Sequence, residues 1–181
     1  NAKITDIKIM NKSIALASIE STYKERIFIG TSPVVKIDGK WKLIRGIPGA
    51  GYVEFSTKSN RDKVEVEVEK AINSYSSALK SGDMTEIKKY IMIPPDANQD
   101  RLEEHFKAIS EEPKSNIKVT AKGIKVISDT FAIAQIEVKR DHFSFTENHA
   151  VGKENGQWKV LFGPTLTNSA IPIGDKPVEV E

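Results

Sequence analysis

The residues best suited to chemistry lie on one predicted strand, at 142–151. Phe143, Phe145, Glu147 and His149 share one parity, so on a strand their side chains point to the same face. If the phenylalanines point into the interior of the fold, Glu147 and His149 follow them. A carboxylate beside an imidazole in a partly apolar pocket suits general acid–base catalysis, because burial raises the carboxylate pKa toward the working pH.

The simpler interpretation is that Glu147-Asn148-His149 forms a turn or bulge near the strand end and faces water. Tyr75 and Tyr90 lie on the apolar stripes of two predicted helices and could add hydroxyl groups to the same pocket. The candidates for a ligand pocket are Tyr75, Tyr90, Phe143, Phe145, Glu147 and His149, of which Glu147 and His149 are also the catalytic candidates.

The sequence gives little support for other kinds of site, such as metal, phosphate or nucleophile sites. Cysteine is absent, which excludes disulfides and thiolate sites within these 181 residues. The histidines, His105, His142 and His149, form neither H-x-x-x-H nor H-E-x-x-H, so we predict no metal and no cofactor. There is no glycine-rich phosphate loop and no G-x-S-x-G elbow. The 27 basic and 25 acidic residues are interspersed, so we expect no nucleic-acid partner.

The elements that must position these residues come from an internal repeat. Residues 7–46 and 124–163 align without a gap at an offset of 117 positions, with 13 identities in 40. The alignment predicts two copies of one β-rich unit. Identical pairs include Ala15/Ala132, Ala17/Ala134, Ile19/Ile136, Val34/Val151, Lys36/Lys153 and Trp41/Trp158.

Local patterns fill in the elements. Residues 7–46 predict three or four antiparallel strands with a hairpin at Asp38-Gly39. Alternation over 64–68 indicates a segment that is extended or frays into the next helix, after which apolar spacing predicts a helix ending at Gly82. A second helix starts at Asp83 and ends at Pro94-Pro95, and a third runs from Asp100 to Pro113. Further strands are predicted at 117–126, 130–139, 142–151 and 157–162.

The order of helices and strands over 64–163 resembles the nuclear-transport-factor-2-like (cystatin-like) superfamily. The resemblance is carried by VEKAINSYSSALKSGDMTEIKKYI at 68–91 and by the closing strand ENGQWKVLFG at 154–163. It implies an α+β fold in which helices pack on one face of a curved antiparallel sheet, as a cone. Catalytic members of the superfamily, which include isomerases and dehydratases, use an Asp or Glu base and a Tyr or His partner inside the cone.

The expected organisation is a partial repeat at 1–50 holding only the strand half of the unit. A linker at 51–63, a complete domain at 64–163 and an irregular tail at 164–181 follow. In the partial copy, helices would be missing from the apolar face of the sheet, and such a face aggregates unless it is covered. We expect packing against the second domain, or against another chain as in a homodimer, together with loss of an upstream portion.

Tandem, lysine-rich, cysteine-free copies also resemble the extracytoplasmic region of Gram-positive membrane-anchored proteins of the teicoplanin-resistance-associated type. That resemblance implies an extracytoplasmic location, an anchor upstream, and no direct membrane contact within this segment. The first functional hypothesis is a non-catalytic binding or assembly module of the cell envelope, whose partner is a protein or envelope component met by a sheet face or the cone mouth. The alternatives are an isomerase- or dehydratase-type enzyme using Glu147 and His149, and a small-molecule carrier using the same pocket.

Overall fold

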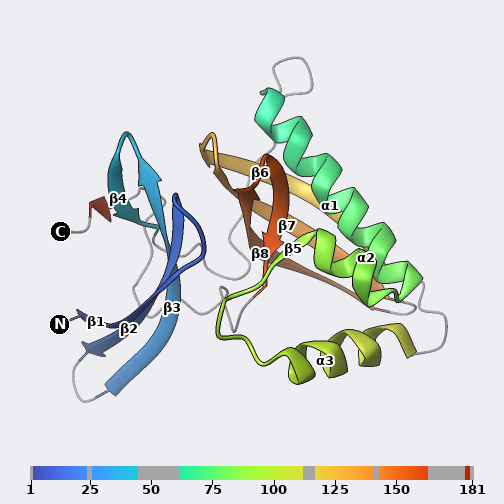
Figure 1. Cartoon of the computed structure of the whole chain (residues 1–181), viewed down its shortest axis with the longest axis horizontal. Coiled ribbons are helices and arrows are strands. Elements are labelled where there is room, and N and C mark those ends of the chain that lie inside the picture. The colour runs from blue at the N-terminus through green and yellow to red at the C-terminus, as the bar shows by residue number, and fades with distance from the viewer. Residues whose placement is uncertain are drawn as a thin grey trace.

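The chain folds around two sheets that lie side by side, with helices on the far side of the second (Figure 1). The first is antiparallel, and the second is antiparallel apart from one short parallel pairing at its edge. The structure is a computed structural model, which describes residues 2–23, 26–44, 62–111, 117–140, 143–162 and 178–179. The first sheet has the strand order β1 (Ala2–Ile9), β2 (Ile14–Tyr23), β3 (Arg26–Ile37), β4 (Lys40–Leu43), β10 (Val178–Glu179). The second has the order β5 (Ile91–Met92), β9 (Gln157–Leu161), β8 (Phe143–Glu154), β7 (Phe131–Arg140), β6 (Lys118–Ser128).

The α+β class predicted from the sequence is confirmed. Helices α1 (Lys63–Ser81), α2 (Met84–Lys89) and α3 (Gln99–Glu111) all belong to the second sheet's side of the molecule. Their apolar residues, among them Ile72, Ile87 and Phe106, join one core with the helix-facing residues of that sheet. The tail was predicted to be irregular or weakly extended, and its residues Val178 and Glu179 pair with β4. Its other residues lie outside the described ranges, as do those of the predicted linker up to residue 61.

The strand registers of the two sheets coincide at the offset of 117 positions. Ala17 faces Ser32 across β2 and β3, and Ala134 faces His149 across β7 and β8. Even the bulge in β1 after Ile4 has its counterpart in β6 after Ala121. The β3–β4 and β8–β9 hairpins both turn through a non-glycine residue at positive φ followed by glycine: Asp38 (53°) and Gly39 (79°), Asn155 (51°) and Gly156 (82°).

The two sheets pack through corresponding faces. Ile14 and Leu16 of β2 meet Phe131 and Ile133 of β7 in one buried cluster. At the centre of this contact Gly152 leaves room for its neighbours, because a Cβ there would lie 2.5 Å from Ile14 Cδ1. The first sheet therefore packs against the second domain, but through the face opposite to the one that was expected to lack its helices.

Helix α1 begins earlier than the sequence predicted. Asp62 is the N-cap, its carboxylate accepting the Val64 N–H, and the helix starts at Lys63. The prediction of an extended segment over 64–68 is wrong, because Val64 and Val68 lie one turn apart on the core side of the helix. Gly82 ends the helix in the left-handed conformation, as predicted.

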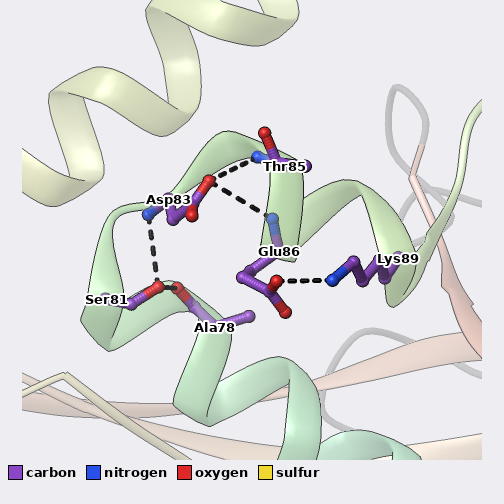
Figure 2. A network of polar contacts seen from close by, with 6 residues as sticks. All are labelled: Ala78, Ser81, Asp83, Thr85, Glu86 and Lys89. Atoms are coloured by element: carbon purple, nitrogen blue, oxygen red, sulfur yellow. Dashed lines mark hydrogen bonds and ion pairs between the residues drawn. The ribbon is translucent and has the colours of Figure 1, made fainter.

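The junction between α1 and α2 is a compact set of caps (Figure 2). The Ser81 hydroxyl donates to the Ala78 carbonyl and accepts the Asp83 N–H. The Asp83 carboxylate then accepts the N–H groups of Thr85 and Glu86, so the predicted start of the second helix is confirmed. These caps satisfy backbone groups at both helix ends and fix the angle at which α2 leaves α1.

Candidate functional site

Glu147 and His149 lie in a regular part of β8. Both are half-buried, and His149 Nε2 is 2.7 Å from Glu147 Oε1. Their strand partners are Ile136 and Ala134, which belong to the core under the helices. Because directly opposite residues share a face, the pair points to the helix side, as its shared parity with Phe143 and Phe145 predicted. The alternative of a water-facing turn or bulge is wrong here.

Tyr75 approaches this pair from α1. Its side chain is buried, and burial together with the negative charge of Glu147 raises the pKa of its hydroxyl. The neighbouring Ser76 fixes this part of the helix, since its hydroxyl accepts the Val119 N–H of β6 over 2.9 Å. Three of the predicted pocket residues, Tyr75, Glu147 and His149, are thus brought together by α1 and β8.

The electrostatics of the pair differ from those of a tuned general base. The hydrogen bond with His149 holds the pKa of Glu147 below its ordinary value, and this outweighs the opposing effect of burial. Glu147 is therefore ionised at neutral pH and engaged by the imidazole. A catalytic carboxylate working as a base near neutrality needs the opposite shift. The arrangement is suited to holding a fixed charge and an oriented imidazole ring.

Phe143 and Phe145 form an exposed aromatic patch next to the pair. They are 57% and 43% exposed, and their rings stack with centroids 6.1 Å apart. Their strand partners are Arg140 and Val138, which therefore lie on the same face. Val138 is buried, so we call Arg140, Phe143 and Phe145 the aromatic patch. Exposed aromatic rings beside arginine are the residue types enriched in protein interfaces.

Tyr90, the remaining predicted pocket residue, belongs to a different place. It ends α2, its N–H donating to the Ile87 carbonyl, and its own carbonyl accepts the Val160 N–H of β9. It lines an open cleft of about 310 Å³ together with Trp158. That cleft includes none of Tyr75, Glu147 and His149, so the six predicted residues do not form one pocket.

Glu67 is the residue in this cleft that sequence reasoning missed. Its carboxylate accepts hydrogen bonds of 3.0 Å from the Trp158 indole and from the Lys153 ammonium. These two bonds, the indole's first, hold the pKa of Glu67 below its ordinary value. A buried tryptophan needs an acceptor for its N–H, and that requirement was the available signal that a polar residue of α1 would lie over Trp158.

The remaining titratable residues considered in the sequence make structural contacts or lie outside the described residues. On the second sheet, Glu137 pairs with Lys122 at 3.0 Å and with Lys139 at 3.4 Å. His105 is exposed and makes an edge contact with Phe106. His142 lies outside the described residues. Within those residues no group of three potential metal ligands occurs, and no helix is long and apolar enough to span a bilayer.

Comparison with known proteins gives a structural likeness. No family model and no curated protein matches the sequence. Among solved structures, a chain described as "Ntf2 like protein involved in plasmid conjugation" is similar with 13% sequence identity and a TM-score of 0.38. The alignment covers 88% of this chain and 73% of that one.

Proposed function

We propose that this chain is a non-catalytic binding and assembly module, and that it holds a protein partner at the aromatic patch. The observation that carries the proposal is the exposure of Phe143 and Phe145 on the helix side of the second sheet. Two large apolar rings left in water are costly for a protein that does not use them. The burial of both rings by a partner would remove this exposed area from water.

The hydrogen-bonded Glu147–His149 pair beside the patch supports recognition. Glu147 and His149 hold each other at 2.7 Å, so a partner meets a fixed carboxylate and not a mobile one. Groups that are already oriented lose little conformational entropy when a complex forms. The patch therefore offers apolar anchors next to an ordered polar rim, which is the usual anatomy of a protein interface.

The test is capture of partners from extracts of the source cells, followed by measurement of affinity for any protein recovered. Phe143→Ser combined with Phe145→Ser should weaken the complex at least tenfold, the usual effect of removing interface anchors. Thr146→Ala is the matched control, because Thr146 is exposed on the opposite face of the same strand. Equal affinity of the double variant and the unchanged chain would exclude the patch as the binding surface.

A small-molecule carrier or an isomerase- or dehydratase-type enzyme is the second candidate. It is favoured by the convergence of Tyr75 on the Glu147–His149 pair. On this alternative, a ligand found by NMR screening would shift the ring resonances of His149 and Tyr75 together, and Tyr75→Phe would weaken it. Ligands that perturb only Phe143 and Phe145 would favour the assembly module instead.

The setting we propose for the module is the outer surface of a bacterial cell. The resemblance to extracytoplasmic tandem units supports this setting. Treatment of intact cells with a protease that cannot enter them should remove the module while a cytosolic marker survives. Survival of both would contradict an exposed location.

A further inference from the structure

The open cleft beside Trp158 carries an excess of positive charge. It has a volume of about 310 Å³ and lies between α1, the end of α2 and the hairpin that joins β8 to β9. Three lysines from three elements line it: Lys70 of α1, Lys89 of α2 and Lys153 of β8. Among the lining residues that the structure describes, Glu67 provides the only carboxylate. Pockets for small molecules begin at about this volume, so the cleft is a candidate site for an anionic ligand.

The Glu67 carboxylate is already engaged by its neighbours. It accepts hydrogen bonds of 3.0 Å from the Lys153 ammonium and from the Trp158 indole. The Lys153 and Glu67 side chains are 27% and 34% exposed, and the Lys153 ammonium also lies 5.3 Å from the centroid of the Trp158 ring. These contacts hold Lys153 in the wall of the cleft, so a ligand meets an ammonium group that is already ordered.

Lys70 and Lys89 supply the charge that this network leaves over. Lys89 bonds to Glu86, which is not part of the described lining (Figure 2). Its side chain is 54% exposed, so it can turn toward a ligand. Lys70 is exposed, and no carboxylate of the described residues pairs with its ammonium. An ammonium group without a partner at the wall of a cleft is available to a bound anion.

We propose that this cleft binds a phosphate monoester group, with the ammonium groups of Lys70, Lys89 and Lys153 around it. Three ammonium groups and one carboxylate leave two positive charges in the lining, and a phosphate monoester carries about −1.5 to −2 charges at neutral pH. Lysine acts on phosphate as a point charge, whereas the planar fork of arginine is suited to a carboxylate. The described lining contains no arginine, which favours phosphate.

The cleft is separate from the aromatic patch. Its described lining includes none of Arg140, Phe143 and Phe145. Phe143→Ser combined with Phe145→Ser should therefore leave phosphate binding unchanged, and the loss of either surface can be measured without the other.

The test follows the indole N–H signals of the whole chain by NMR while ribose 5-phosphate is added at low ionic strength. The chain has two tryptophans, so Trp41 serves as the internal control for Trp158. The expected result is a saturable shift at Trp158 alone, with a dissociation constant below about 1 mM. Added salt should weaken the binding, and ribose without phosphate should cause no shift.

Charge variants give opposite expected effects. Lys70→Gln should weaken binding about threefold, and its combination with Lys89→Gln about tenfold, because each change removes an ammonium group from the cleft. Glu67→Gln should strengthen binding, since it removes the carboxylate and keeps an oxygen that can accept the indole N–H. Lys80→Gln is the matched control: Lys80 is exposed on the same helix and absent from the described lining, and it lies about 15 Å along the helix axis from Lys70.

A lipid headgroup is the other source of such a group, and vesicles of phosphatidylcholine containing phosphatidic acid test it. Co-sedimentation that Lys70→Gln abolishes and Lys80→Gln preserves would assign the phosphate group to a membrane surface. A response to ribose 5-phosphate alone would assign it to a soluble molecule. The proposal is overturned if neither probe binds at several millimolar phosphate. It is also overturned if Lys80→Gln weakens binding as much as Lys70→Gln, or if Glu67→Gln weakens it.

Discussion

The first and second sheets share a register, a bulge and a hairpin turn, yet they have different surroundings. In the second sheet, α1 and its neighbours bury the helix-side face from β6 to β9, except at the aromatic patch. In the first sheet, the same face is buried at β2 and open at β1. The comparison shows that alternation in a strand determines which residues share a face, whereas the rest of the chain determines whether that face is buried.

The largest expected difference is between Ile124 and Ile7, which match at the offset of 117 positions. Ile124→Ala should lower the free energy of unfolding by about 2–5 kcal/mol, because it opens a cavity in a packed core. Ile7→Ala should change it by less than about 0.5 kcal/mol, because the side chain is already in water. Urea denaturation of both variants measures this. Equal losses of stability would mean that the two faces are equally covered, which would contradict the difference between the sheets.

The next largest effect is at the contact between the sheets. Gly152→Val should cost about 1–3 kcal/mol, since a Cβ would lie 2.5 Å from Ile14 Cδ1 and 2.9 Å from Leu161 Cδ1. Gly152→Ala should cost less, because the atoms in the way are flexible side-chain ends. Val35, the counterpart of Gly152 in the first sheet, is fully buried. Thermal unfolding that shows no loss of stability for Gly152→Val would contradict this packing between the sheets.

A smaller effect separates the two copies at the Glu147–His149 pair, which corresponds to Gly30 and Ser32 in the first sheet. His149→Gln should raise the pKa of Glu147 toward the ordinary glutamate value, because the hydrogen bond from the imidazole is the main cause of its lowering. Carboxyl NMR titration measures this. An unchanged pKa would show that His149 does not hold the carboxylate.

The lowered pKa of Glu147 also determines how the stability of the chain changes with pH. A folded-state pKa below the unfolded one means that Glu147 contributes stability above the unfolded value, which is about 4.3. That contribution is lost as the pH falls below this value and through the lower folded pKa. In the chain with His149→Gln this acid-dependent loss should shrink, which denaturation at a series of pH values between neutral and acidic can test.

The smallest effect distinguishes the two tryptophans. Each has a lysine over its ring, Lys36 at 6.0 Å from Trp41 and Lys153 at 5.3 Å from Trp158. Trp158 also donates to Glu67, and within the described residues no carboxylate takes that place at Trp41. Trp158→Phe should therefore raise the pKa of Glu67, and Trp41→Phe should leave it unchanged. A shift with Trp41→Phe would contradict the distinction.

Much of the fold could be predicted because the repeat and the turn residues are local signals. Asp38-Gly39 and Asn155-Gly156 marked both hairpins, and the parity of β8 placed Glu147 and His149 on the helix side. The start of α1 was missed because Val64 and Val68 fit an alternating strand as well as a helix turn. Strand β5 has two residues and pairs parallel with β9, which leaves no periodic signal to find.

Part of the candidate site could also be predicted, because it depends on local patterns. Positions on one strand follow from alternation, and Tyr75 follows from the apolar stripe of its helix. Tyr90 was misplaced because its direction depends on how α2 ends against β9. The partnership of Glu67 with Trp158 joins residues 91 positions apart, and spacing along the sequence carries no record of such a contact.

The most direct test of the difference between the two sheets is the solvent exposure of individual isoleucine methyl groups, measured by NMR with a soluble paramagnetic probe. The account predicts strong broadening at Ile7 and Ile9 and little at Ile124, which holds the corresponding position under α1. Equal protection of Ile7 and Ile124 would contradict it, because the helix-side face of the first sheet would then be closed at β1.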